Sequence, residues 1–339
     1  MAVTIKEIAK IANVSVCTVS RVINNTYPEK VSKGTRLRVL KVMKDLGYRP
    51  SIIARGLAKK KTSLLGLIVR DIMSSFYPEI IEGIEDEAKK FDYSLILCTT
   101  KGNPKEEAKY LRLLREKRVD GIILTPVINE QANIKLFEEL KRDKIPLVFI
   151  AYYLKEFKGL YVVVDHKLGG YMATKHLIEL GHKRIGYLGK ENDIVGKERA
   201  KGYKQALFEY NIEFNKELII KSGYSWKDGY YSMKRFLKTK NNRPTAIFAI
   251  CDMTAWGAMQ AIRQEGLKVP EDIAIVGFDD LGISSLMEVP LTTIAQPKYE
   301  MGKVAVTKLI KKIEHKNARG TILKPKLVIR KSSGDRRAF

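Results

Sequence analysis

Residues 4–24 read TIKEIAKIANVSVCTVSRVIN, which encodes two short helices joined by a tight turn. Thr4 and Glu7 have the spacing of a capping box, in which each side chain caps the backbone N–H of the other residue, so we expect a helix to begin there. Asn13 tolerates the left-handed conformation of a tight turn, and Ser15 can cap the second helix. The pattern predicts a helix-turn-helix.

The second helix has an inward and an outward face. Val19, Val22 and Ile23 share one side at helical spacing, so we expect them to face the core. The opposite side carries the candidate base readers Val16, Cys17, Ser20 and Arg21. Because Val16 and Cys17 are small and nearly apolar, we expect them to favour a thymine methyl group over guanine.

A third helix is predicted after Ser32, which can cap it. Leu40, Met43 and Leu46 are expected to face inward, and Gly47 can end the helix in the left-handed conformation. A three-helix bundle with no role in DNA binding would show the same periodicity. The periodicity alone therefore leaves the function of these helices open.

The charge of the first 61 residues favours a nucleic-acid partner. They contain nine Lys and five Arg against three acidic residues, which accounts for +11 of the chain's net charge of +24. Clustered cations displace counterions from DNA phosphates and so provide affinity that does not depend on sequence. The composition thus supports a DNA-binding headpiece.

Beyond residue 61, short apolar runs alternate with amphipathic stretches. The predicted strands are Leu64–Val69, Tyr93–Cys98, Gly121–Leu124, Leu147–Ile150, Arg184–Leu188, Leu218–Ile220, Ala246–Ile250 and Ile273–Gly277. Helical segments between them indicate parallel sheets with crossover helices. A break near Val164 and Asp165 divides the strands into two sets, which predicts an α/β fold with two doubly wound domains.

A series of short motifs runs in one order along nearly the whole chain. They are VSVCTVSRVIN at 14–24, GYRP at 47–50, ARGL at 54–57, FY at 76–77, GIE at 83–85, VDGII at 119–123, LGH at 180–182, Arg199, GY at 202–203, PTAIF at 244–248, VGFDD at 276–280, LTTI at 291–294 and Gln296. Together they closely resemble the LacI/GalR family of bacterial transcription regulators. Several motifs in one order make the resemblance specific.

The resemblance implies a helix-turn-helix headpiece, a hinge helix, and two parallel-sheet subdomains similar to periplasmic binding proteins. The expected boundaries are 1–48 for the headpiece, 49–61 for the hinge and linker, 62–163 with 295–322 for the N-terminal subdomain, and 164–294 with 323–339 for the C-terminal subdomain. The chain of the family crosses between the subdomains three times. Here the crossings are expected near Val163–Asp165, Leu291–Ala295 and Thr321–Lys324, and the last helix, near Tyr299–His315, should return to the N-terminal subdomain.

The resemblance also implies which residues contact DNA. Matched position by position, they are Thr4, Ser15, Val16, Cys17, Thr18, Ser20, Arg21, Asn24, Tyr48, Ser51, Ala54, Arg55, Leu57 and Ala58. The family reads near-palindromic operators as dimers, so we expect a homodimer. The hinge at 52–58 is too short for a stable isolated helix and is expected to fold only on DNA, where Leu57 would wedge between base steps.

A ligand site is expected at the carboxyl ends of the strands, where open α/β sheets bind small molecules. By spacing and resemblance its candidates are Asp71, Phe76, Tyr77, Arg199, Tyr224, Asp252, Asp279 and Gln296. An arginine fork and carboxylates suit hydroxyl-rich or anionic ligands. Aspartates after strands can instead cap helices, and the aromatic pair could belong to the core.

The identity of the effector is left open, with a sugar or related metabolite expected. Many sugar-responsive members of the family carry a carboxylate at the end of the fourth strand, where this chain has AYY at 151–153. Catabolite-control regulators, which use a phosphorylated carrier protein as corepressor, remain an alternative. They tend to carry an arginine near the motif that reads MEVP at 287–290 here, and Glu288 would repel a phosphoprotein.

Other classes of protein fit the sequence less well. The sequence has no Walker loop, HExxH or nucleophile elbow, and its four histidines lack metal-ligand spacing, so we expect no enzyme activity, metal or cofactor. A sugar-binding solute receptor would share the two-domain core but needs an export signal. The N-terminal residues lack the apolar run of such a signal, and no segment approaches the ~20 apolar residues of a membrane span, so a cytoplasmic protein is expected.

Overall fold

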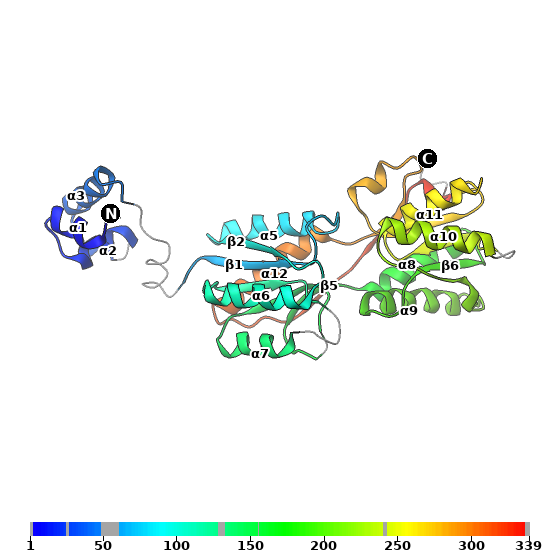
Figure 1. Cartoon of the computed structure of the whole chain (residues 1–339), viewed down its shortest axis with the longest axis horizontal. Helices are drawn as coiled ribbons and strands as arrows, with labels where there is room; N and C mark the ends of the chain where they lie inside the picture. Colours follow the sequence, from blue (N-terminus) through cyan, green and yellow to red (C-terminus); the bar gives the residue numbers. More distant parts are fainter. Residues whose placement is uncertain are drawn as a thin grey trace. The chain divides into compact units, whose positions relative to one another are not determined.

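The computed structural model describes residues 3–24, 27–48, 61–127, 133–154, 156–239 and 243–335. The chain divides into two compact units, Met1–Ser63 and Leu64–Phe339, here called the headpiece unit and the core unit (Figure 1). Each unit has its own apolar core. Within the described ranges, no helix is both long and apolar enough to cross a membrane.

The headpiece unit contains α1 (Ile5–Ile11), α2 (Val16–Asn24), the short helix η1 (Pro28–Lys30) and α3 (Lys33–Asp45). The capping box forms as predicted, since the Thr4 N–H donates to the Glu7 carboxylate at 2.7 Å and the Glu7 N–H donates to the Thr4 hydroxyl at 3.4 Å. Asn13 adopts a positive φ of 49° in the turn between α1 and α2. The helix-turn-helix geometry therefore follows from local capping and turn chemistry.

The inward face of α3 differs from the sequence-based expectation. Val39 is fully buried, whereas Leu40, which was expected to face inward, is 44% exposed. Val42, Met43 and Leu46 pack against the same cluster as Val39. Positions 39, 42, 43 and 46 follow the helical repeat, while Leu40 is rotated away from that face by about 100°. The prediction for Leu40 was wrong because the apolar stripe starts one residue earlier.

The first subdomain of the core unit is built on a parallel sheet of order β11-β5-β4-β3-β1-β2. Its strands are β1 (Leu64–Val69), β2 (Ser94–Thr99), β3 (Gly121–Leu124), β4 (Leu147–Ala151), β5 (Leu160–Val164) and β11 (Thr321–Leu323). One face is covered by α5 (Pro78–Lys90) and α12 (Lys298–Ile313), and the other by α6 (Pro104–Glu116) and α7 (Ile134–Arg142).

The second subdomain has a sheet of order β12-β10-β9-β8-β6-β7. Its strands are β6 (Ile185–Gly189), β7 (Ile219–Lys221), β8 (Ala246–Ala249), β9 (Ala274–Asp279), β10 (Thr292–Ala295) and β12 (Lys326–Val328). The covering helices are α8 (His166–Glu179) and α9 (Ile194–Glu209) on one face, and α10 (Trp226–Thr239) and α11 (Asp252–Gln264) on the other. Short helices η2 (Lys216–Leu218), η3 (Gly282–Ser285) and η4 (Lys331–Ser333) lie in the connections.

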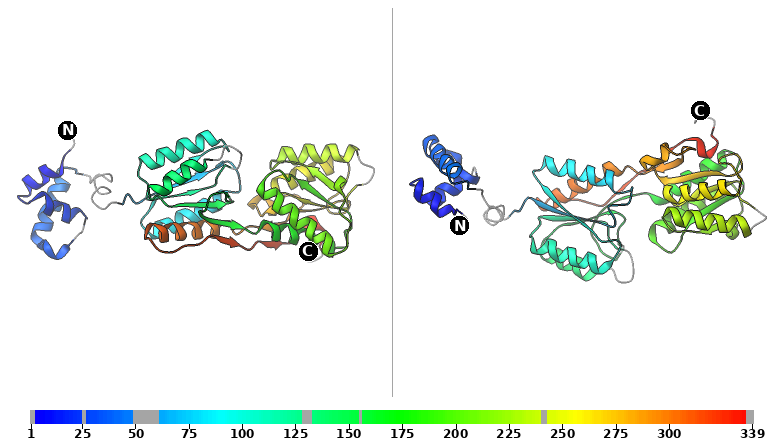
Figure 2. Two further views of the ribbon diagram at one scale, coloured as in Figure 1. Left: turned by 90° about the horizontal axis from the view of Figure 1, so that it is seen from below. Right: turned by 45° about the horizontal axis from the view of Figure 1, so that its top comes forward.

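Both sheets are parallel except for β12, which pairs antiparallel with β10 at the edge of the second sheet. The predicted α/β fold class with two doubly wound subdomains is confirmed. Three connections join the subdomains: β5 to α8, β10 to α12, and β11 to β12. Figure 2 shows the orange helix α12 in the first subdomain, although β10, which precedes it, belongs to the second sheet.

Three pairs of helices pack through facing glycines: α5 with α12, α8 with α9, and α10 with α11. Each helix contributes one glycine at which an added Cβ would lie 2.0–2.3 Å from a backbone carbonyl oxygen of the partner helix. These residues are Gly83 and Gly302, Gly170 and Gly202, and Gly229 and Gly257. Only a residue without a side chain allows such close backbone approach.

We expect Gly202→Ala to destabilise the core unit by about 1–3 kcal/mol, as overpacking does in other proteins. Its new methyl group would lie 2.0 Å from the Lys167 carbonyl oxygen, so α8 and α9 would have to separate. Gly282→Ala is the control, because no heavy atom lies within 4 Å of the added carbon. Urea unfolding followed by circular dichroism measures both; equal stability of the two variants would argue against a glycine-dependent contact.

Candidate functional site

The outward face of α2 is the candidate DNA-reading surface. Val16 is 42% exposed, Cys17 is exposed, and Ser20 and Arg21 are partly exposed. Ser15 caps α2, since its hydroxyl accepts a hydrogen bond from the Thr18 N–H at 3.1 Å. With the opposite side of α2 buried in the headpiece core, this face is presented to solvent as a unit.

The other predicted DNA contacts lie around this face or beyond the described residues. Thr4 caps α1, and Tyr48 packs partly buried against the headpiece core. The Asn24 amide donates to the Ser20 carbonyl at 2.9 Å, while its buried Oδ1 has no partner among the described residues. The predicted hinge contacts fall outside the described residues; they are Ser51, Ala54, Arg55, Leu57 and Ala58.

Arg199, from α9, is the central charge of the candidate ligand site in the core unit. Its side chain is 4% exposed, and its guanidinium lies 3.5 Å from the centroid of the Phe278 ring. Nη1 donates to the Ile250 carbonyl, and Nη2 donates to the Asp279 carboxylate at 3.3 Å. The aromatic face and the carboxylate offset the cost of burying this cation. Its Nε has no hydrogen-bond partner within the described part of the chain.

Asp279 ends β9 beside Arg199. Its Oδ1 also accepts a hydrogen bond from the Gln296 amide at 2.7 Å, so the structure brings together three of the predicted site residues. Burial raises the pKa of the Asp279 carboxyl, while the positive charge of Arg199 opposes that rise. The Oε1 of Gln296 is buried and lacks a partner among the described residues.

His166, the first residue of α8, adjoins this cluster and was not predicted as a site residue. Its Nδ1 lies 3.4 Å from the Arg199 Nη2. Burial and the charge of Arg199 lower the pKa of His166 to about 3, so the ring is neutral at pH 7 and can accept a hydrogen bond. Across the described ranges, no group of three or more His, Cys, Asp and Glu side chains could hold a metal ion.

The aromatic residue Tyr77 lies close enough to the cluster for the charge of Asp279 to affect it. The Phe76 and Tyr77 rings pack edge to face with centroids 5.3 Å apart, and burial raises the pKa of Tyr77 to about 12. Phe76 also packs against the core of the first subdomain. Tyr152, which sequence reasoning treated only as a departure from the family, is partly buried and close enough to Tyr77 and Asp193 to be affected by their charges. Residues of both subdomains therefore face one another here.

Asp193 and Lys190 form a second polar group that sequence reasoning missed. Asp193 caps α9 by accepting from the Gly196 N–H at 2.8 Å, and it accepts from the Tyr224 hydroxyl at 2.9 Å and from Lys190 at 2.9 Å. Burial by itself would raise the pKa of Asp193, but these bonds outweigh burial and lower it. The Lys190 ammonium lies 4.8 Å from the centroid of the Tyr224 ring. Asp193 and Lys190 therefore hold the ring of Tyr224, one of the predicted site residues.

Asp71 and Asp252 make contacts within the protein. Asp71 accepts from the Met73 N–H at 3.0 Å in a tight turn after β1. Asp252 is fully buried, and its Oδ2 accepts from the Leu281 N–H at 2.8 Å and from the Ser284 hydroxyl at 2.6 Å. Burial raises the pKa of Asp252 to about 7. Asp252 therefore anchors the loop after β9, and its contact with an effector stays a prediction, as does that of Asp71.

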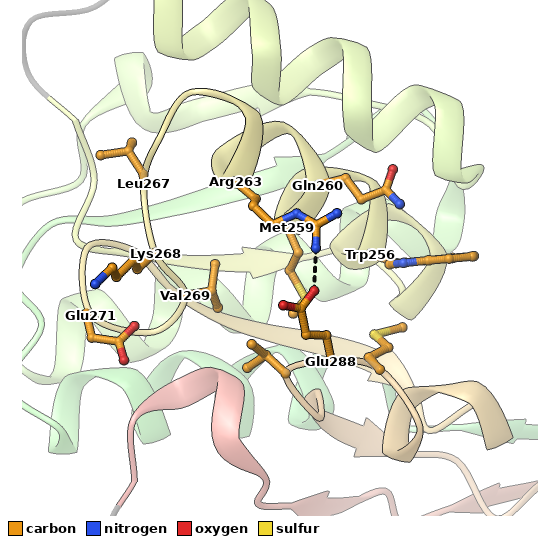
Figure 3. A pocket seen from close by; sticks show the side chains of 11 residues that line it. Trp256, Met259, Gln260, Arg263, Leu267, Lys268, Val269, Glu271 and Glu288 are labelled. Carbon is orange, nitrogen blue, oxygen red and sulfur yellow. Dashed lines mark hydrogen bonds and ion pairs between the residues drawn. The ribbon is translucent and has the colours of Figure 1, made fainter.

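A separate groove of about 430 Å³ lies along α11 in the second subdomain (Figure 3). It is lined by Trp256, Met259, Gln260, Arg263, Leu267, Lys268, Val269, Glu271, Met287, Glu288 and Val289. Glu288 pairs with Arg263, so the acidic charge expected to repel a phosphoprotein is partly compensated. The Trp256 ring packs edge to face with Trp226, which stacks on Tyr230. No local pattern in the sequence indicates this surface, which combines residues 256–271 with residues 287–289.

Comparisons with known proteins agree with the two-unit architecture. Residues 4–51 match the family described as bacterial regulatory proteins, lacI family, and residues 174–333 match the periplasmic binding protein-like domain. The HTH-type transcriptional regulator DegA of Bacillus subtilis is 37% identical over 336 residues, which cover 98% of each chain. The ribose operon repressor of Haemophilus influenzae is 38% identical over 333 residues, which cover 97% of this chain and 98% of the relative.

A solved structure extends the agreement to three dimensions. The Lac repressor dimer bound to operator and the anti-inducer ONPF has a TM-score of 0.87 and 27% sequence identity, covering 98% of this chain and 99% of that chain. The resemblance found in the motifs is therefore confirmed by similarity over the full length. The chain belongs to the lacI family of bacterial regulatory proteins.

Proposed function

We propose that this chain is a transcription repressor that binds a near-palindromic operator as a homodimer and is controlled by a sugar or related metabolite bound around Arg199. The main support is the buried cluster of Arg199, Asp279 and Gln296. Within it, Arg199 Nε and Gln296 Oε1 have no hydrogen-bond partners among the described residues. An exposed helix such as α2 is common to many DNA-binding proteins. The buried cluster, in contrast, provides a place where a controlling ligand can bind. We also propose a cytoplasmic location, because a bacterial operator lies in the cytoplasm.

The polar groups of the cluster suit a hydroxyl-rich ligand. A hydroxyl group both donates and accepts, so it can donate to Gln296 Oε1 and accept from Arg199 Nε. The rings of Phe76, Tyr77 and Tyr224 offer faces for a sugar or a planar base. The name of one relative, the ribose operon repressor, supports a sugar as the ligand.

The outward face of α2 supports the DNA-binding half of the proposal. We expect Arg21→Ala to cost ~1–3 kcal/mol of operator affinity and to relax the preference at one base pair, because the guanidinium fork can meet guanine O6 and N7. Selection of sites from random duplex DNA, followed by titration of the selected duplex, measures both effects. Arg38→Ala removes an exposed arginine of α3 and should leave base preference unchanged. Equal weakening of all sequences by Arg21→Ala would make Arg21 a phosphate contact instead.

The ligand half can be tested by the melting temperature of the full chain with sugars, sugar phosphates and purines, since a ligand that binds the native state raises it. Asp279→Asn should abolish the stabilisation by any active compound, because a charge-assisted hydrogen bond is lost, and should leave operator binding without ligand nearly intact. Asp45→Asn, in the headpiece unit, is the matched control. An unchanged dose response in Asp279→Asn would refute the site, and a panel without any active compound would favour control by a phosphoprotein.

The groove along α11 is proposed as the surface that a second copy of the chain covers. Leu286, next to the groove, is 82% exposed, and Trp256, Met287 and Val289 add apolar lining. A two-fold interface uses the same patch from both copies, so the opposite charges of Arg263 and Glu288 at the groove could be exchanged between copies. Two paired headpieces would then read the two halves of the operator.

We expect Leu286→Glu to convert the dimer to a monomer at micromolar concentration, because it buries a charge in an apolar interface. Phe208→Glu is a closely matched control, since Phe208 is also 82% exposed but lies at the end of α9. Sedimentation velocity distinguishes the two states. A dimer that persists in Leu286→Glu, or one that is lost equally in Phe208→Glu, would place the interface elsewhere.

A further inference from the structure

Lys298, in the first turn of α12, has a buried ammonium group with three acceptors. Its side chain is 1% exposed. The Nζ donates to the Asp279 carbonyl at 2.8 Å and to the Asp280 carbonyl at 2.7 Å, and it pairs with the Glu79 carboxylate at 3.0 Å. Three acceptors match the three N–H donors of an ammonium group. The burial of this charge is therefore matched by a complete set of bonds.

The two carbonyls belong to a turn with an unusual backbone. Asp279 has a φ of 118° and Asp280 a φ of 50°, and neither residue is glycine. Such conformations cost free energy and persist only when the surroundings hold them. The Arg330 guanidinium holds the Asp280 carboxylate at 2.7 Å, but the bonds to both carbonyls come from Lys298. Lys298 thus fixes the backbone from which the Asp279 side chain projects.

The fixed backbone decides where the Asp279 carboxylate points. That carboxylate meets Gln296 at 2.7 Å and Arg199 at 3.3 Å, the groups assigned above to effector binding. Lys298 reaches the carbonyl of Asp279, whereas the carboxylate faces the cluster. The lysine can therefore determine the geometry of the site without being one of the groups assigned to the ligand.

The remaining partner of Lys298 lies in the first subdomain, to which α12 itself belongs. Glu79 is in the first turn of α5, two residues after Tyr77, and its side chain is 47% exposed. One ammonium group therefore joins the turn after β9 in the second subdomain to the segment that carries the aromatic pair in the first. The ion pair with Glu79 supplies the third acceptor of the ammonium group.

We propose that Lys298 is a positioning residue of the effector site: it clamps the turn at residues 279 and 280, aims the Asp279 carboxylate at Arg199 and Gln296, and is itself held in place by Glu79. The proposal rests on the function proposed above for this site. Its effect on the turn, however, can be measured without any ligand, so that failure of one proposal can be told from failure of the other.

Hydrogen–deuterium exchange of the full ligand-free chain tests the clamp. In Lys298→Met, we expect the Leu281 and Ser284 amides to exchange about tenfold faster or more, since charge-assisted hydrogen bonds that hold the turn are lost. Lys303→Met, which alters a more exposed lysine of the same helix, should leave these amides unchanged. Unchanged exchange in Lys298→Met, or equal acceleration throughout α8 and α9, would overturn the proposal, because the second result indicates a merely structural role.

Thermal stabilisation by D-ribose and by hypoxanthine tests the consequence for the ligand. A compound that stabilises the unaltered protein should lose most of its effect in Lys298→Met and part of it in Glu79→Gln, with Glu82→Gln on the same helix as control. Full stabilisation of Lys298→Met, together with faster exchange of the turn, would overturn the positioning role. If neither compound stabilises the unaltered protein, the function fails for these ligands while the exchange result still decides the clamp.

Discussion

The close contact of paired helices at facing glycines is the constraint on which the ligand site depends. Gly170 of α8 lies against the backbone carbonyl of Arg199, and Gly202 of α9 lies against that of Lys167, directly after His166. The same contact that packs α8 on α9 therefore sets the distance between the Arg199 guanidinium and the His166 ring. The α5–α12 crossing works in the same way, since Gly302 lies against the carbonyl of Ile80, next to Glu79, whose carboxylate pairs with Lys298.

Much of the fold could be predicted because it depends on local patterns. Leu64–Val69 and Gly121–Leu124 were predicted to the residue, since uninterrupted apolar runs bounded by polar segments are typical of buried parallel strands. β5 and β10 were not predicted as strands, because both adjoin crossings and were interpreted as connections. Leu40 was misplaced for a different reason, because a one-residue shift in the apolar stripe changes the buried face of a helix.

The site was predicted less completely, because its chemistry depends on tertiary contacts. Arg199, Asp279 and Gln296, which form one cluster, were predicted from the motifs shared with the family. His166 and Lys298 were not, since a lone histidine or lysine at a helix start has no pattern to mark it as buried. A local signal did exist for Asp193, which stands three residues before Gly196 and caps α9. The role of Asp252 as a loop anchor depends on Leu281 and Ser284, about thirty residues further along, and no local spacing indicates it.

The three connections between the subdomains also determine when each can be completed during synthesis. The core of the first subdomain includes Met301, Val306 and Leu309 of α12, and its sheet ends with β11. Because translation is vectorial, β1 to β5 leave the ribosome long before these last pieces exist. While the whole sequence from α8 to β10 is made, the first subdomain therefore lacks α12, and α5 alone covers that face of its sheet. β11 completes the first sheet and β12 completes the second, and the two strands lie only a few residues apart in the chain. We therefore expect the two subdomains to complete folding together rather than one after the other.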